Sequence, residues 1–98
     1  MLDENRSSQP APVQVRLAPL LMIHFPTADR VVAVPATTVD EMIDGLESRW
    51  PGMRDRICDS RPAIRRHMNV FVDGKRATLK TRLAPGADVF ILTAISGG

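Results

Sequence analysis

The chain has 98 residues, of which 44% are hydrophobic and 24% are charged, and its formal net charge at pH 7 is +2. This length and balance fit a single globular domain with one modest core and argue against an intrinsically disordered chain. The small net charge does not by itself imply a nucleic-acid or membrane partner, and the single cysteine, Cys58, excludes an intrachain disulfide and is compatible with a reducing cytoplasm.

The first twelve residues are polar, contain proline and show no hydrophobic period, so we expect a disordered leader over residues 1–12. Asp3 and Glu4 stand where a secretory signal would carry basic residues. The longest apolar run, residues 18–25, is too short to span a bilayer. We therefore expect a cytoplasmic protein without a membrane partner.

Two segments of the N-terminal half predict the strands of a hairpin. Residues 13–17 alternate apolar and polar side chains with a period of two, which is the pattern of a half-buried strand. Residues 30–34 are an arginine followed by an apolar run, and Pro35 closes that run. We expect residues 30–34 to form the returning strand.

The segment between these strands also has the composition of a strand, but Pro19 and Pro26 bracket residues 20–25 closely. Proline punctuates strands because it cannot donate a hydrogen bond to the ladder. We therefore expect a loop or short turn over residues 20–25, with Leu21 and Ile23 packed inward.

The clearest local signal is the start of a helix. Thr38, followed three residues later by Glu41, forms a capping box. The apolar residues that follow recur at helical spacing, and a proline–glycine pair ends the helix after about Arg49. These apolar residues are Val39, Met42, Ile43, Leu46 and Trp50. A second, shorter helical turn is expected over residues 53–59.

The C-terminal half predicts three more strands. Residues 69–72 have strand composition, and Asp73-Gly74 is the signal of a hairpin turn. Residues 77–79 predict a short partner strand. Residues 84–87, Ala-Pro-Gly-Ala, place proline and glycine in the positions of a type II turn. Residues 88–93 predict the last strand, which is apolar enough to be central in a sheet.

Residues able to carry catalysis are sparse. His24 and His67 have no cysteine or carboxylate at a ligand-like spacing, so no metal site is expected. The sequence contains no phosphate-binding glycine loop. Cys58 and His67 could in principle form a thiolate pair, but a buried structural cysteine is the favoured interpretation. We therefore expect a protein that is not an enzyme.

Basic residues cluster between positions 54 and 67. They are Arg54, Arg56, Arg61, Arg65, Arg66 and His67. Three interpretations are open: a solvated surface, a protein-docking patch, and a nucleic-acid footprint, which usually adds exposed aromatics or a recognised motif. Because neither is present in the sequence, no nucleic-acid partner is expected. The docking interpretation, with Arg65 and Arg66 as partner-binding residues, gains if the cluster lies beside the C-terminal tail.

The chain ends in Ser96-Gly97-Gly98, directly after the last predicted strand. Glycine visits most of backbone space, so we expect residues 94–98 to be a thin and flexible tail. Such a tail can thread a narrow channel and place its terminal carboxylate in the active site of another protein. Chance alone gives two terminal glycines in about half a per cent of chains. The diglycine alone therefore does not establish a function.

The expected order of strand, strand, helix, strand, short strand, strand and tail is the β-grasp pattern. From about Val13 to Gly98, the sequence resembles the MoaD/ThiS family of ubiquitin-like sulfur-carrier proteins. The resemblance is carried by residues 36–39, 46–51, 66–74, 83–92 and 97–98. It implies an α+β, ubiquitin-like domain over residues 13–93, with a mixed sheet of four to five strands packed on one main helix.

The resemblance also implies a carrier cycle. An E1-like enzyme would use ATP to adenylate the carboxylate of Gly98, a sulfur donor would convert the adenylate to a thiocarboxylate, and a client enzyme would accept the sulfur. Gly97 would supply flexibility, and Ile95 and Ser96 would contact the partner. The carrier would bind no cofactor and could act as the small subunit of a sulfur-transferring synthase.

The resemblance leaves the pathway open. Residues 66–74 are similar to the subgroup that carries sulfur for cysteine synthesis, and the same stretch occurs in molybdopterin-type relatives. Many relatives have a proline shortly before the diglycine, whereas residues 92–96 contain none, and this difference bears on the identity of the partner. Two other functions stay open: a non-covalent β-grasp interaction module, and a ubiquitin-like modifier that forms isopeptide bonds with lysines.

Overall fold

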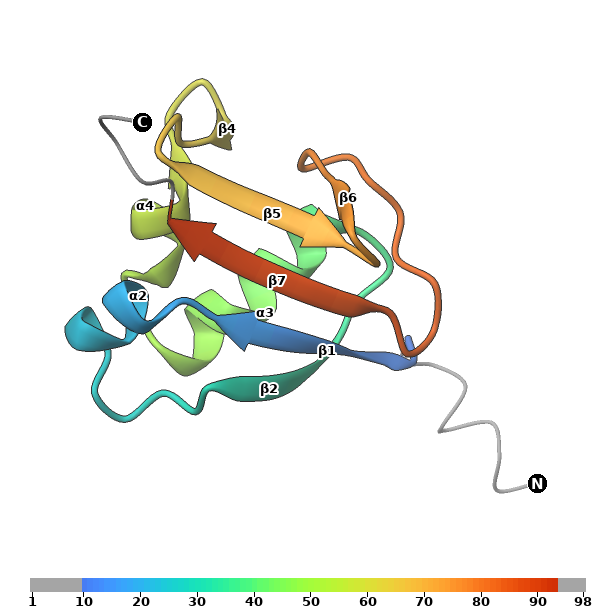
Figure 1. Cartoon of the computed structure of the whole chain (residues 1–98), viewed down its shortest axis with the longest axis horizontal. Coiled ribbons are helices and arrows are strands. Elements are labelled where there is room, and N and C mark those ends of the chain that lie inside the picture. The colour runs from blue at the N-terminus through green and yellow to red at the C-terminus, as the bar shows by residue number, and fades with distance from the viewer. Residues whose placement is uncertain (1–9, 94–98) are drawn as a thin grey trace.

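The computed structural model describes residues 10–93, which form a five-stranded sheet with a helix across one face (Figure 1). The elements in chain order are β1 (Pro12–Leu17), α2 (Pro19–His24), β2 (Val31–Pro35), α3 (Val39–Arg49), α4 (Met53–Ile57), β3 (Cys58–Asp59), β4 (Ala63–Ile64), β5 (Met68–Val72), β6 (Lys75–Arg76) and β7 (Asp88–Thr93). Residues 1–9 of the predicted leader and the predicted tail at 94–98 lie outside the described residues, so both assignments stay predictions.

The sheet is mixed, with strand order β2-β1-β7-β5-β6. Strand β1 is antiparallel to β2 and parallel to β7, whereas β5 is antiparallel to both β7 and β6. The first and last long strands therefore lie side by side in the middle of the sheet. This arrangement confirms the α+β, β-grasp fold expected from the sequence. Among residues 10–93, no helix has the length and apolar character that a membrane span requires.

The core lies between α3 and the inner face of the sheet. Val32, Val15, Val89 and Val72 are successive cross-strand neighbours and form one apolar row on this face. Val39, Met42, Ile43 and Leu46 of α3 belong to the same buried cluster, and each has no exposed surface. Burial of each side chain of this size stabilises the fold by about 1.5–3 kcal/mol. The helical spacing of these residues therefore predicted the buried face of α3.

The start of α3 differs from a simple capping box in one contact. The backbone N–H of Glu41 donates to Thr38 Oγ1 at 3.2 Å, as predicted. The carboxylate of Glu41, however, accepts from the backbone N–H and the hydroxyl of Thr37, at 2.8 and 2.7 Å, and thus reaches one residue further back than expected. The next N–H groups, of Val39 and Asp40, donate to the carbonyls of residues 81 and 79. The helix N-terminus is therefore satisfied partly by a distant loop.

The loop or turn expected over residues 20–25 is wrong, because this segment is the helix α2. Pro19 occupies the first helical turn, where its missing N–H costs nothing and its fixed φ suits a helix. Pro19, which was expected to mark the boundary of a strand, therefore begins a helix. Leu21 is buried as predicted, but Ile23 is 68% exposed, because an i to i+2 spacing that shares a face in a strand points to different sides of a helix.

The partner strand expected over residues 77–79 is also misplaced. Asp73 and Gly74 both have positive φ, 49° and 87°, and make a two-residue turn that pairs β6 with β5 immediately. After Ala77, the chain leaves the sheet, and the carbonyls of residues 79 and 81 accept hydrogen bonds from the first N–H groups of α3. By contrast, the predicted turn over residues 84–87 is present, with the N–H of Ala87 donating to the carbonyl of Ala84 at 3.1 Å and Gly86 at φ 76°.

The segment after α3 is more ordered than the sequence indicated. The short helical turn is present as α4, but it ends at Ile57, two residues before the predicted end. Residues 58–64, in which no strand was predicted, carry the two-stranded pair β3–β4. This small unit lies behind the sheet, on the side of α4 (Figure 1). It delivers the chain to the start of β5.

Candidate functional site

The candidate site begins where β7 ends. Strand β7 is paired on both sides, with β1 and with β5, and Thr93 is its last residue. Thr93 lies opposite Met68, the first residue of β5. The predicted functional residues that follow, Ile95, Ser96, Gly97 and Gly98, lie outside the described residues. Their roles therefore stay predictions, but the point from which they leave the sheet is defined.

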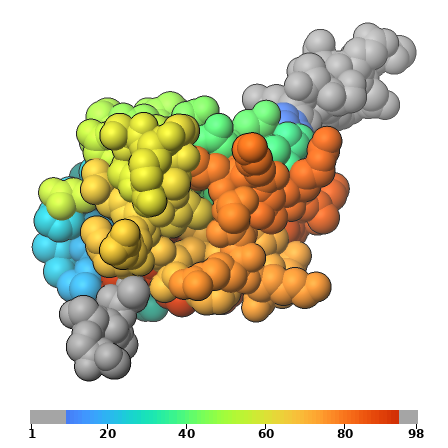
Figure 2. Space-filling model, turned by 90° about the horizontal axis from the view of Figure 1, so that it is seen from above, coloured from blue at the N-terminus to red at the C-terminus, as the bar shows by residue number. Residues whose placement is uncertain are grey.

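Two predicted partner-binding residues lie beside this point. Residues 65–67, Arg-Arg-His, directly precede Met68, so this short basic segment adjoins the end of β7. In Figure 2, the start of β5 and the region of α2 occupy the same end of the molecule. The position of Arg65 and Arg66 beside the end of β7 favours a docking surface over a merely solvated one.

The structure divides the basic cluster into paired and unpaired residues. Arg54 contacts the carboxylates of Asp40 at 2.9 Å and Asp44 at 2.8 Å, and so ties α4 to α3. Arg61 pairs with Asp59, and hydrogen bonds from the side chain and backbone N–H of Arg61 lower the pKa of Asp59 to about 2. These two arginines are therefore structural.

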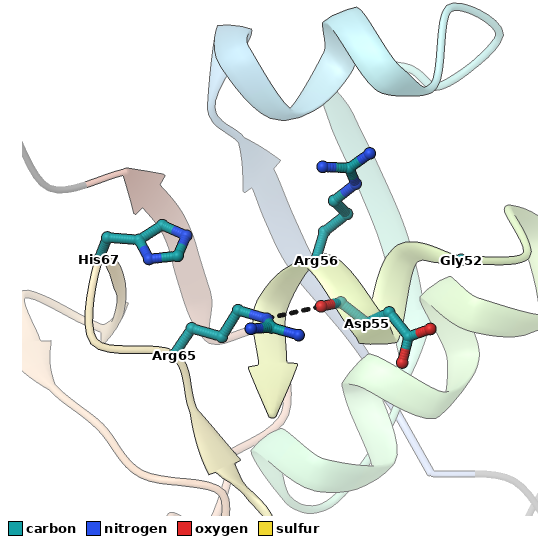
Figure 3. Close-up of a pocket in the computed structure, with 5 residues that line it drawn as sticks. All are labelled: Gly52, Asp55, Arg56, Arg65 and His67. Atoms are coloured by element: carbon teal, nitrogen blue, oxygen red, sulfur yellow. Dashed lines mark hydrogen bonds between the residues drawn. The ribbon is translucent and has the colours of Figure 1, made fainter. Parts of the chain in front are cut away.

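The remaining four basic residues of the cluster form no ion pair within residues 10–93. They are Arg56, Arg65, Arg66 and His67. Three of them, all but Arg66, line a surface hollow of about 560 Å³ together with Gly52 and Asp55 (Figure 3). Arg65 Nε donates to the backbone carbonyl of Asp55 at 2.7 Å. The hollow thus brings together two arginines without an ion pair in this part of the chain and a histidine.

Arg56 and His67 were counted in the basic cluster but were not predicted as site residues. The sequence shows that both residues are basic. It does not show that α4 packs against the segment before β5 and so brings the two residues together. The side chain of Arg65 donates to the carbonyl of Asp55 in α4, and the backbone N–H of Arg65 donates to the carbonyl of Ile57 at 2.8 Å. Contacts between segments that are distant in sequence leave no local signal of this kind.

A second surface, the outer face of the sheet, carries exposed apolar side chains. Within residues 10–93, the exposed large hydrophobic residues are Leu20, Ile23, Val31, Phe90 and Leu92. Val31, Arg16 and Phe90 are cross-strand neighbours, and the guanidinium of Arg16 lies over the Phe90 ring at 5.4 Å from its centroid. Residues of this face line a hollow of about 530 Å³ with Arg16 and Arg30 at its rim. Val31, Phe90 and Leu92 line this hollow, and we call these three residues the apolar face, whereas Leu20 and Ile23 lie on α2.

The apolar face was not predicted as a site. Val89 to Leu92 was interpreted as an apolar run of a central strand, and β7 is central by hydrogen bonding. However, α3 covers only one side of the sheet, so Val89 and Ile91 are buried whereas Phe90 and Leu92 are 38% and 39% exposed. An apolar run does not show which of its two faces is covered.

Cys58 is a buried residue of the core, as the sequence analysis favoured. Burial raises the pKa of its thiol, and its sulfur lies 3.9 Å from a guanidinium nitrogen of Arg54. A buried thiol with a raised pKa is a poor nucleophile. Within the part of the chain that the structure describes, no group of three or more histidine, cysteine or carboxylate residues is placed to hold a metal ion.

No protein-family model matches the sequence, and no similar curated protein was found. Solved structures do match. A chain of the Amycolatopsis orientalis BexX/CysO complex is 29% identical, with a TM-score of 0.77, over 88% of this chain and 99% of that one. Mycobacterium tuberculosis CysO is 27% identical, with a TM-score of 0.77, over 85% of this chain and 99% of its own. SAMP1 from Haloferax volcanii, at 24% identity and a TM-score of 0.75 over 90% and 100%, shares the fold.

These neighbours are small proteins that this chain matches along almost their whole length, and one of them was solved in complex with a second protein. Their TM-scores show that they share the fold described above. The chain is therefore a ubiquitin-like β-grasp protein of the MoaD/ThiS type, of the general kind of small sulfur-carrier proteins.

Proposed function

We propose that the protein is a sulfur carrier whose Gly98 carboxylate is adenylated by an E1-like enzyme and converted to a thiocarboxylate. The sulfur then passes to a client enzyme in cysteine or molybdopterin-type cofactor biosynthesis. The protein acts as a co-substrate, and ATP is bound by the activating enzyme. Gly97 and Gly98 enter the partner's active site, while Ile95 and Ser96 contact its channel.

The observation that carries this proposal is the position of β7. A strand held on both sides is a rigid base, and its last residue, Thr93, is five positions before Gly98. Five fully extended residues span at most about 17 Å. This reach is sufficient for the terminal carboxylate to enter a recessed active site while the folded domain stays on the partner's surface. The two glycines carry no Cβ, so they fit a narrow channel.

The surfaces around Thr93 also support a protein co-substrate. The apolar face and the hollow lined by Arg56, Arg65 and His67 lie near the end of the molecule where β7 finishes. Protein interfaces typically combine an apolar centre with a polar rim. One CysO neighbour was solved as part of a complex with BexX. A partner that binds these surfaces would hold the last five residues close to its own catalytic groups.

The chemistry is an acyl substitution that balances without a redox step. The carboxylate oxygen of Gly98 attacks the α-phosphorus of ATP, and pyrophosphate leaves. Hydrosulfide then attacks the acyl carbon. The bond from carbon to the phosphate oxygen breaks, AMP leaves, and a C–S bond replaces it. The carrier contributes only the carboxylate.

The first step is tested by ATP–pyrophosphate exchange with an E1-like enzyme of the same organism. Wild-type chain should support exchange, and deletion of Gly98 should lower the rate by about 100-fold or more, because the carboxylate is withdrawn by about 3.5 Å and misplacement by 1 Å already costs about that factor. The thermal midpoint of the deletion variant should be unchanged. Equal exchange with both chains would contradict the role of Gly98.

A further inference from the structure

We propose that the hollow formed by Arg56, Arg65 and His67 is an oxyanion subsite that binds carboxylate side chains of the protein that receives the C-terminal segment. We call it the basic hollow. The inference rests on the proposed function, since it names the chemistry of the partner's surface next to the tail. It predicts an acidic loop or helix on that partner, facing α4 and the start of β5.

The pairing of charges is the first argument. Of the six basic residues between positions 54 and 67, Arg54 and Arg61 are bound to carboxylates of this chain. The other four form no ion pair among residues 10–93, and three of them surround a single hollow. A solvated basic surface has no reason to concentrate its unpaired charges in one concave place.

The orientation of Arg65 is the second argument. Arg65 Nε donates to the carbonyl of Asp55 at 2.7 Å, which fixes the guanidinium at the wall of the hollow (Figure 3). A guanidinium carries five N–H donors, so the Nη1 and Nη2 groups keep four for a ligand. Their fork geometry matches a carboxylate. The carboxylate of Asp55, which also lines the hollow, points away from His67 and forms no ion pair within residues 10–93 (Figure 3).

The surroundings favour a protein ligand over a nucleic acid. Gly52 lies at the floor of the hollow, and a Cβ placed there would lie 3.6 Å from the ring of Phe25, the residue after α2. The hollow therefore adjoins α2, which carries the exposed apolar side chains of Leu20 and Ile23. Apolar and basic surfaces side by side match a protein interface, in which the charges steer association and fix the register.

The subsite can be tested on the isolated full chain by NMR, with a tetraglutamate peptide as the probe. The peptide should shift the resonances of Gly52 N–H, Arg65 Nε–H and the His67 ring. Arg56→Glu should weaken binding by about tenfold at low salt. The matched control is Lys75→Glu, an exposed lysine beside the end of β5 opposite to the hollow. This variant should change the affinity by less than about twofold.

Two results would overturn the inference. One is a loss of peptide binding that is equal for Lys75→Glu and Arg56→Glu, which would mean unspecific attraction to net charge. The other is inorganic phosphate that binds in the hollow more tightly than the peptide, which would assign the subsite to a phosphate-bearing ligand.

The subsite and the proposed function fail in different ways. In the exchange assay, Arg56→Glu should raise the KM for the carrier by about tenfold at low salt with kcat unchanged, because the lost contact acts on encounter and not on the acyl chemistry. Deletion of Gly98 should abolish exchange and leave the peptide titration unchanged. Peptide binding by a chain that supports no ATP–pyrophosphate exchange would refute only the carrier function. Exchange with an equal KM for wild type and Arg56→Glu would refute only the subsite.

Discussion

At the scale of single residues, the start of α3 depends on one carboxylate. Glu41 accepts two hydrogen bonds from Thr37, and the bond from the backbone N–H of Thr37 is the main reason that the pKa of Glu41 lies below its ordinary value. A carboxylate whose pKa is lowered by folding stabilises the native state above its ordinary pKa. This stabilisation is lost as the pH falls through the lowered value.

We therefore expect Glu41→Gln to lower the thermal midpoint at pH 7, and the difference from wild type to shrink at an acidic pH at which Glu41 is protonated in the folded state. Thermal unfolding at both pH values measures this. Asp29→Asn is the matched control, because Asp29 is an exposed carboxylate that has no ion pair within the described residues. A wild-type advantage that persists unchanged at low pH would show that the ionised carboxylate is not what caps the helix.

At the scale of elements, Gly45 sets how closely α3 approaches β2. A Cβ at this position would lie 2.6 Å from Cγ1 of Val34, which is 1% exposed and held in the sheet. A β-branched side chain in a strand has little freedom to move aside. The contact explains why the helix interior tolerates a residue that costs about 1 kcal/mol relative to alanine.

Gly45→Ala is therefore expected to destabilise the protein by about 1 kcal/mol, because overpacking of about 1–3 kcal/mol outweighs the gain in helix propensity. Urea unfolding measures the change. Ser48→Ala, at an exposed position of the same helix, should be neutral or slightly stabilising. If Gly45→Ala stabilised the protein as much as Ser48→Ala does, the close approach to Val34 would be excluded.

The elements also show which parts of the structure can be predicted from sequence. The strand β7, the helix α3 and the turn at residues 84–87 were predicted because spacing, capping residues and turn residues are local signals. The helix α2 was missed because Pro19 suits both a strand boundary and a helix start. The path of residues 78–83 was missed because it is fixed by N–H groups of α3, some forty residues away along the chain.

The candidate site follows the same division. Arg65 and Arg66 were singled out from the sequence, and the structure places them beside the end of β7. Arg56 and His67 join the hollow only through the packing of α4 against the segment before β5. The pairing of Arg54 with Asp40 and Asp44 could not be predicted either, since nothing in the sequence distinguishes a structural arginine from an unpaired one.

At the scale of the whole molecule, the two surfaces with an evident capacity for binding both lie near one end. The apolar face covers the open side of the sheet, and the basic hollow lies between α4 and the start of β5. Strand β7 finishes at Thr93, near both surfaces. A partner that covers this end would control access to Gly98 without any chemistry from the carrier.

The most direct test of the carrier function is the intact mass of the full chain after incubation with ATP, sulfide and the E1-like enzyme. Replacement of one carboxylate oxygen by sulfur should raise the mass by about 16 Da, and fragmentation should place the increase on Gly98. An unchanged mass, with an enzyme that is active on another carrier, would contradict the central claim.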